Sequence, residues 1–197
     1  MTMNLLRAII SFPDRLKKAY KLRLFKKKAN CGANLSVCPK SNISVEEGSS
    51  VTIGHDCDIL GIISATCGAG GTVGDYTTIR GESVIGAAAG ISIGSHVIIS
   101  NNVHIYDNNN HPTDPAKRRD LCESGFYSPL WHWRNSDSAP VVIEDNVWIG
   151  ERATILKGVT IGKGSVVACD SVVTHCAPPY CVMAGNPAKV VKTLPHA

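Results

Sequence analysis

Aromatic residues are scarce in this chain of 197 residues, at 6%, and charged residues make up only 18%. Hydrophobic residues reach 44% and glycine occurs 18 times, so we expect a core of aliphatic side chains between tight turns. No apolar run approaches the roughly 20 residues that a membrane-spanning helix needs. The composition therefore predicts one globular domain with a substantial core and no transmembrane helix.

Cysteine is frequent, with eight residues, but no two of them are spaced as C-x-x-C. The start of the sequence lacks a secretory leader with a small-residue cleavage site. The chain is also larger than the small secreted scaffolds that depend on disulfides. We expect cytoplasmic, reduced thiols that pack mostly as small hydrophobic side chains.

Positive charge is concentrated at the start of the chain. Nine basic residues and one acidic residue give residues 1–28 a net charge of +8, so the rest carries −4 of the total of +4. This distribution does not favour nucleic-acid binding by the main body. Residues 1–30 are expected to form a basic helical arm, which Pro13 splits into two helices.

The arm also carries apolar side chains at helical spacing, namely Leu5, Ile9, Phe12, Leu16 and Tyr20. Two interpretations of this pattern stay open. Residues 1–28 could contact an anionic membrane surface, or the helix could pack on the rest of the protein with its lysines in solvent.

A period of six residues is the main structural signal. Aliphatic side chains recur at this interval at Ile143, Ile149, Ile155, Ile161, Val167 and Val173. Earlier runs are Val73, Ile79 and Ile85 and, after a two-residue slip at 87–90, Ile93, Ile99 and Ile105. A six-residue period fits neither an α-helix nor simple strand alternation. It predicts an all-β fold over residues 31–176, a parallel β-helix with three short strands per coil.

The repeat stops over residues 106–142, which are polar at the start and carry several aromatic residues near the end. A long loop on a rigid scaffold is a usual place for a functional site. The aromatic residues favour an ordered loop over a disordered insertion. Residues 177–197 are predicted to form a C-terminal tail that covers the open end of the coils.

Four motifs carry a family resemblance, namely Ile93-Gly94-Ser95-His96-Val97, His111-Pro112-Thr113-Asp114-Pro115, Asp145-Asn146-Val147-Trp148-Ile149-Gly150 and Ala184-Gly185-Asn186-Pro187-Ala188-Lys189. With them the sequence resembles the hexapeptide-repeat acyltransferases, nearest the galactoside/maltose and polysaccharide O-acetyltransferase branch. The resemblance implies a left-handed β-helix and a homotrimer with active sites between neighbouring β-helices. It also implies acetyl-CoA as donor, direct transfer and no metal.

The resemblance assigns roles to individual residues. His111 is the expected general base, which suits a neutral imidazole near pH 7. The backbone N–H of Glu151 is the expected donor to the oxyanion. The remaining cofactor contacts are expected from Trp148 beside the pantetheine arm, Cys169 and Thr174 in the CoA groove, and Lys189 and Lys192 at the phosphates.

The acceptor contacts are less closely matched. An acid that the sugar enzymes place near Ala88 is missing, and Arg80 and Glu82 stand in the same region. We expect these two residues, His104 on the strand before the loop, and Trp131 and Trp133 to contact the acceptor, the tryptophans by stacking on a sugar ring. The loop is also longer than in the simple sugar enzymes, so the acceptor's identity does not carry over.

The leading interpretation is a cytoplasmic O-acetyltransferase acting on a sugar hydroxyl of a cell-surface polysaccharide or its precursor, with contact to the inner face of the membrane left open. Within this chemistry, a xenobiotic, antibiotic or amino-sugar acceptor is the alternative. A γ-type carbonic anhydrase needs three metal-binding histidines, and His96, His104 and His111 are out of step with a six-residue side. A non-catalytic assembly subunit is disfavoured because His111, Trp148 and Gly185-Asn186-Pro187 occur together.

Overall fold

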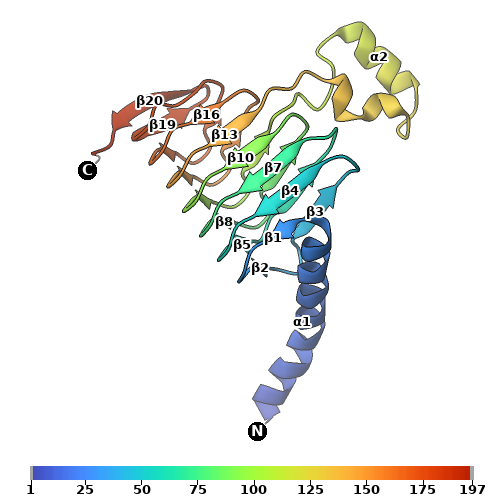
Figure 1. Ribbon diagram of the computed structural model, residues 1–197, viewed down its shortest axis with the longest axis vertical. Helices are drawn as coiled ribbons and strands as arrows, with labels where there is room; N and C mark the ends of the chain where they lie inside the picture. The colour runs from blue at the N-terminus through green and yellow to red at the C-terminus, as the bar shows by residue number, and fades with distance from the viewer. Residues whose placement is uncertain (1, 196–197) are drawn as a thin grey trace.

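The structure is a computed structural model that describes residues 2–195, with side chains described from residue 13 onward. The chain folds as the predicted left-handed parallel β-helix, whose coils stack into three parallel sheets (Figure 1). Sheet A contains β1 (Asn30–Cys31), β4 (Ser50–Ile53), β7 (Gly70–Val73), β10 (Ile91–Ile93), β13 (Val141–Ile143) and β16 (Thr160–Ile161). Sheet B contains β2 (Ser36–Val37), β5 (Asp58–Ile59), β8 (Thr78–Ile79), β11 (Ile98–Ile99), β14 (Trp148–Ile149), β17 (Val166–Val167), β19 (Cys181–Gly185) and the antiparallel β20 (Ala188–Thr193). Sheet C contains β3 (Asn42–Val45), β6 (Ile62–Ala65), β9 (Val84–Ala87), β12 (His104–Tyr106), β15 (Thr154–Ile155) and β18 (Val172–Val173).

The repeat aliphatics form the core. Ile93, Ile99 and Ile105 are all buried. They are the register partners of Ile143, Ile149 and Ile155 in the next coil, although 50 residues separate each pair. This stacking confirms the six-residue registers. Each isoleucine also packs on its equivalents above and below, so the coils are held together by a continuous apolar column.

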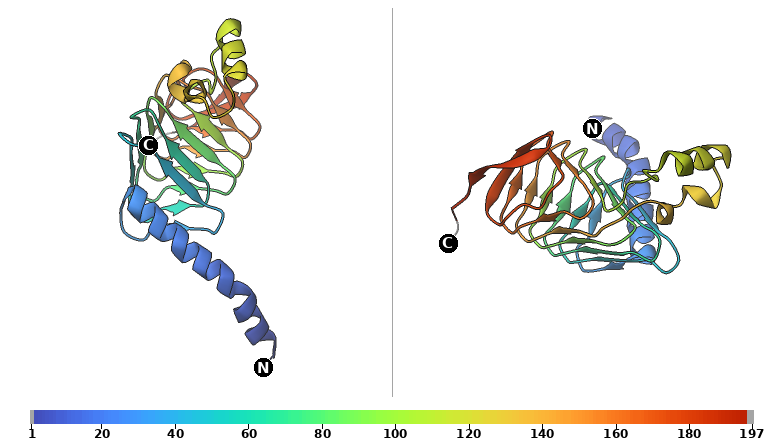
Figure 2. Two further views of the ribbon diagram at one scale, coloured as in Figure 1. Left: turned by 90° about the vertical axis from the view of Figure 1, so that its right-hand side faces the viewer. Right: turned by 90° about the horizontal axis from the view of Figure 1, so that it is seen from above.

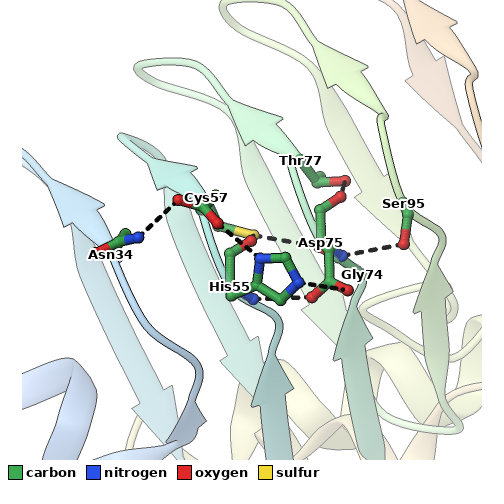
Figure 3. A network of polar contacts seen from close by, with 8 residues as sticks. Asn34, His55, Cys57, Gly74, Asp75, Thr77 and Ser95 are labelled. Carbon is green, nitrogen blue, oxygen red and sulfur yellow. Dashed lines mark hydrogen bonds and ion pairs between the residues drawn. The ribbon is translucent and has the colours of Figure 1, made fainter.

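The turns between sheets A and B, here called the A–B corner, carry a polar network (Figure 3). Its centre is His55, whose Nδ1 lies 2.7 Å from Asp56 Oδ2 and whose Nε2 lies 3.1 Å from Asp75 Oδ2. Asn34 donates to the Asp56 carboxylate at 2.8 Å, and the Asp75 N–H donates to Ser95 Oγ at 3.1 Å. Each side chain therefore bonds to the coil before or after its own.

Helix α1 (Thr2–Lys28) closes the N-terminal end of the β-helix. Phe25 is fully buried, and Leu22 and Leu24 pack against the same core. Residues 13–20 are exposed on the part of the helix that projects away from the coils (Figure 1). The packing interpretation therefore holds for the end of the helix only. The side chains of Leu5, Ile9 and Phe12 lie outside the described residues.

The expectation of two helices in this arm is wrong, because α1 is continuous through Pro13. A proline inside a helix removes one backbone hydrogen bond and crowds the preceding turn, but the bonds on either side can keep the chain helical. No helix within the described residues is long and apolar enough to cross a membrane. All eight cysteines are free thiols.

Strands β19 and β20 form an antiparallel hairpin at the other end of the stack. β19 still pairs in parallel with β17, and β20 then covers its outer edge. The predicted tail thus contains two strands, while the limits 30/31 and 176/177 as domain boundaries stay predictions.

Candidate active site

The long loop leaves the β-helix between sheets C and A, at what we call the C–A corner. It includes α2 (Pro115–Glu123) and the short 3-10 helices η1 (Pro129–Trp131) and η2 (Trp133–Asn135). The two ends of the loop are bonded to each other. The Asn109 N–H donates to the Asp137 carbonyl at 3.0 Å, and the Ala139 N–H donates to the Asp107 carbonyl at 2.8 Å. The loop is therefore closed at its base and stands away from the coils (Figure 2).

Asp107 fixes the point at which the loop begins. Its buried carboxylate accepts hydrogen bonds from the backbone N–H groups of Ala88, Ala89 and Gly90, at 2.7, 2.8 and 2.6 Å. These three residues form the turn where the sequence shows its two-residue slip. Asp107 is not among the predicted site residues, although its position is a signal: it is the first residue after the last strand before the loop.

His111 lies on the surface just beyond the closed base of the loop. Its ring meets the Trp131 ring edge to face, with centroids 5.5 Å apart. Trp131 is itself held by a 3.0 Å bond from Nε1 to the Gly125 carbonyl and by contact with Phe126 at 5.2 Å. Two predicted residues, His111 and Trp131, are therefore brought together, and the histidine stays accessible while its ring is braced.

Trp133 joins the loop to sheet C. Its ring packs edge to face on Tyr106 at 5.9 Å, and Tyr106 stacks on His104 at 6.4 Å. Gly86 makes this packing possible, because a Cβ there would lie 2.6 Å from the Tyr106 ring and 2.9 Å from Trp133. Burial raises the pKa of the Tyr106 hydroxyl, so it stays a neutral phenol. His104 and Trp133 thus belong to one aromatic row at the base of the loop.

A separate cleft of about 480 Å³ lies at the corner between sheets B and C. Four predicted residues line it, namely Arg80, Trp148, Glu151 and Cys169. The half-exposed Trp148 ring is held by a 3.3 Å bond from Nε1 to Ser100 Oγ. Among the described residues, the Glu151 N–H has no hydrogen-bond partner, so it can donate to a ligand.

Lys192 belongs to the same face of sheet B as the cleft. Trp148 is the register partner of Val166, which pairs with Val182, which pairs with Lys192. Trp148 and Lys192 are therefore three strands apart, about 14 Å at normal strand spacing. Lys189 is exposed on the same strand, β20.

Two predicted residues lie apart from this cleft. Thr174 follows β18 at the C–A corner, where its hydroxyl bonds His175 Nδ1 at 2.7 Å. Glu82 forms an exposed ion pair with Lys40 at 3.6 Å. Neither of them lines the cavity around Trp148. Their predicted contacts with CoA and with the acceptor stay predictions.

One chain does not bring the two halves of the predicted site together. His111 is carried by the loop at the C–A corner, whereas Glu151 and Trp148 line the cleft at the B–C corner. The three histidines weighed as metal ligands are also separate. His96 stacks on Tyr76 at the A–B corner, and within the described residues no three metal-binding side chains are gathered.

Comparison with known proteins agrees with the repeat and the fold. Residues 140–175 match the family described as bacterial transferase hexapeptide (six repeats). YJL218W of Saccharomyces cerevisiae, provisionally named an acetyltransferase, is 38% identical over 122 residues, which cover 62% of this chain and 55% of that protein. The chain spans about half the length of the curated relatives that it matches.

Solved structures match over more of the chain. The polysialic-acid-specific acetyltransferase NeuO has 26% identity and a TM-score of 0.64, with 85% of this chain and 83% of NeuO covered. The hexapeptide-repeat acetyltransferase VCA0836 of Vibrio cholerae, solved with acetyl-CoA, has 26% identity and a TM-score of 0.62, with 92% and 85% covered. The repeat and the stacked coils are thus similar to those of hexapeptide-repeat acetyltransferases, and residues 140–175 match the hexapeptide-repeat transferase model.

Proposed function

We propose that the protein is an acetyl-CoA-dependent O-acetyltransferase that acts on a sugar hydroxyl of a cell-surface polysaccharide or its precursor. The observation that carries this proposal is the accessible His111 imidazole, held by Trp131 on a loop with a closed base. A histidine in this setting can accept a proton from a hydroxyl near neutral pH. NeuO and VCA0836 support the acetyl donor, and the name of NeuO supports a glycan acceptor.

The donor side of the proposal rests on the cleft beside Trp148. Bound acetyl-CoA supplies an acetyl group activated as a thioester. The Glu151 N–H is free to stabilise negative charge on the thioester oxygen, and the Trp148 ring offers an apolar wall. Lys192 and Lys189, on the last strand of the same sheet, suit the CoA phosphates.

The chain's own residues account for each proton in the transfer. His111 takes the proton of the acceptor hydroxyl as that oxygen bonds to the acetyl carbon. The carbon–sulfur bond breaks, and the imidazolium returns the proton to the departing CoA sulfur. The Glu151 N–H stabilises the oxyanion between these two steps. No acyl group is attached to the enzyme.

We further propose that the active site is completed between copies of the chain in a homotrimer. The separation of His111 from the cleft supports this, because the C–A corner of one β-helix would face the B–C corner of its neighbour. A threefold ring of identical contacts then forms three equivalent sites.

The basic part of α1 supports a location at the inner face of a membrane. The exposed residues 13–20 combine Leu16 and Tyr20 with basic side chains, and Phe25 fixes the helix to the coils. We expect the protein to sediment with vesicles containing anionic phosphatidylglycerol and not with neutral phosphatidylcholine vesicles. Binding that is unchanged in a Lys17→Glu/Lys18→Glu variant would contradict this location.

The function is tested by release of free CoA thiol from acetyl-CoA in the presence of oligosaccharides, with product mass to locate the acetyl group. We expect His111→Ala to lower the rate by about 10²- to 10⁴-fold while acetyl-CoA still binds. His96→Ala, an exposed histidine at the A–B corner, is the matched control and should keep its activity. Equal rates in both variants would disprove the role of His111, and acetylation of an amine would shift the proposal to amino-sugar chemistry.

A further inference from the structure

A groove of about 340 Å³ runs between the long loop and the turns of the first two coils. It is lined by Glu46, Thr66, Phe126, Tyr127, Trp131 and His132, and we call it the aromatic groove. We infer that it binds the sugar unit next to the one that is acetylated, and that this unit is uncharged. The inference rests on the proposed function and specifies its acceptor as an oligosaccharide chain.

The aromatic wall of the groove is unusually open to solvent. Tyr127 is 98% exposed and Phe126 is 71% exposed, and their rings meet edge to face at 5.6 Å. Large apolar rings with polar neighbours at the surface mark a binding site more often than a packing site. The C–H face of a pyranose ring is flat and weakly apolar, so it can lie against such rings while its hydroxyls remain hydrated.

The opposite wall supplies hydrogen-bond acceptors for hydroxyl groups. Glu46 comes from the turn after β3, and its carboxylate accepts a 3.4 Å bond from the Cys67 N–H. His132 Nδ1 lies 4.0 Å from the same carboxylate and ties the loop to this turn. A held carboxylate with a free lone pair suits sugar hydroxyls.

Charge then selects among sugars. None of the described residues that line the groove is a lysine or an arginine, whereas Glu46 contributes a negative charge. A carboxylate on the sugar would meet repulsion without a compensating cation. The groove therefore suits neutral sugars and opposes sialic or uronic acids.

Continuity with the catalytic loop sets the position of this sugar. Trp131 lines the groove and also touches the His111 ring at 5.5 Å. A sugar in the groove is therefore one aromatic ring away from the base, which is the distance of a neighbouring unit and not of the reacting hydroxyl itself. The acceptor should thus be at least a disaccharide.

The test titrates the protein with saccharides and follows tryptophan fluorescence. Maltotriose and triacetylchitotriose are compared with their monosaccharide units, and a sialic acid trimer serves as the anionic probe. We expect affinity for at least one neutral trimer to exceed that for its monosaccharide. Tyr127→Ala should lower this affinity about 3- to 10-fold without changing acetyl-CoA binding, whereas Tyr20→Ala, another exposed tyrosine, should not.

Glu46→Gln is the second variant, because it keeps the shape of the side chain and removes its charge. It should weaken binding of the neutral trimer and improve binding of the sialic acid trimer. The inference is overturned if no neutral trimer binds better than its monosaccharide, or if Tyr127→Ala binds like the wild type. It is also overturned if Tyr127→Ala changes the oligomeric mass, because the groove would then be a contact between copies.

Failure of this inference and failure of the proposed function give different results. Acetylation of monosaccharides with no effect of chain length would support the proposed function and contradict sugar binding in the groove. Binding that increases with chain length but without any acetyl transfer would support sugar binding in the groove and contradict the proposed function. In His111→Ala, transfer should be lost while trimer binding is retained.

Discussion

The A–B and C–A corners of the β-helix differ in how much the number of residues between their strands varies from coil to coil. From sheet A to sheet B, the inward-facing register positions are six residues apart in every coil, from Cys31 and Val37 to Ile161 and Val167. From sheet C to sheet A the step is ten residues at Ile43–Ile53, eight at Ile85–Ile93 and 38 at Ile105–Ile143. The largest changes in length are thus at the C–A corner, although the step from sheet B to sheet C also shortens to four residues at Ile59–Ile63.

The hydrogen bonds explain this difference. At the A–B corner, Asp75 and Ser95 each accept a bond from the backbone of the preceding coil. An extra residue there would break bonds with both neighbouring coils. At the C–A corner, Glu46 and Ser49 accept bonds from the turn at 67–68, and Asp107 accepts bonds from the turn at 88–90. These bonds do not continue from coil to coil among the described residues, so the chain can leave and return without disturbing a ladder. A corner that lacks such a ladder can accept a long insertion.

The largest effect is expected from Asp107→Ala, which removes three hydrogen bonds between a buried carboxylate and the backbone at the C–A corner. Three backbone N–H groups lose their acceptor, so unfolding free energy should fall by about 2–4 kcal/mol. Urea unfolding measures the loss, and hydrogen exchange should increase at residues 107–139.

Asp137→Ala is the matched control at the other end of the same loop. Its side chain makes only a 3.5 Å contact with Thr113, while its carbonyl bond to Asn109 survives the substitution. Its stability should change by less than about 0.5 kcal/mol. Equal losses in the two variants would show that Asp107 does not secure the loop through its carboxylate.

A smaller effect is expected where coils approach most closely at the A–B corner. A Cβ on Gly74 would lie 2.6 Å from the backbone of Gly94 and Ser95, so Gly74→Ala should cost about 1–3 kcal/mol. Gly81, at the B–C corner, has its nearest neighbour 4.0 Å away, and Gly81→Ala should be neutral or slightly stabilising. Thermal unfolding measures both effects, and equal shifts of the two midpoints would contradict the close approach of the coils at Gly74.

The smallest effect concerns pH at the A–B corner. The bond to Asp56 raises the pKa of His55, and Asn34 and His55 lower the pKa of Asp56. The His55 contribution is therefore complete below the ordinary histidine pKa of about 6.5 and is lost as pH rises through the raised value. The Asp56 contribution is present above the ordinary carboxyl pKa of about 4 and is lost as pH falls through the lowered value.

These opposite signs define a window for measurement. The melting temperature of the wild type should exceed that of His55→Gln most between about pH 4 and 6.5, and the gap should narrow toward pH 9. Asn135→Ala in the loop is a control with no such pH trend, because the Asn135 amide donates to the backbone carbonyls of Pro129 and Leu130, which do not titrate. A gap that is constant from pH 5 to 9 would contradict the role of the His55 pair.

The sequence predicts most of the scaffold, because its coils depend on local spacing. The six-residue period alone predicts that Ile143 and Ile149 are buried. The slip at 87–90 coincides with a step of eight residues, from Ile85 to Ile93, in place of the usual six. The sequence does not predict partners that meet across coils. Nothing in the sequence near Glu46 indicates that it faces Tyr127. The two residues are 81 positions apart, and the position of Tyr127 depends on how the loop packs.

The candidate site shows the same limit. The motif containing His111 identifies the residue, but its contact with Trp131 depends on how the loop folds back on itself. The continuous helix through Pro13 was also not predicted, since the helix-breaking propensity of proline does not count the hydrogen bonds on either side of it. Residue spacing thus predicts the β-helix, whereas the contacts around His111 depend on packing within the loop.

The hairpin of β19 and β20 also affects whether copies of the protein can stack end to end. A parallel β-helix ends in a row of unpaired backbone groups, onto which the first coil of another copy could dock. Here the last strand runs in the opposite direction, carries a bulge beside Val182 and presents Lys189 and Lys192, while α1 blocks the other end. Head-to-tail stacking of copies is therefore disfavoured at both ends of the coils.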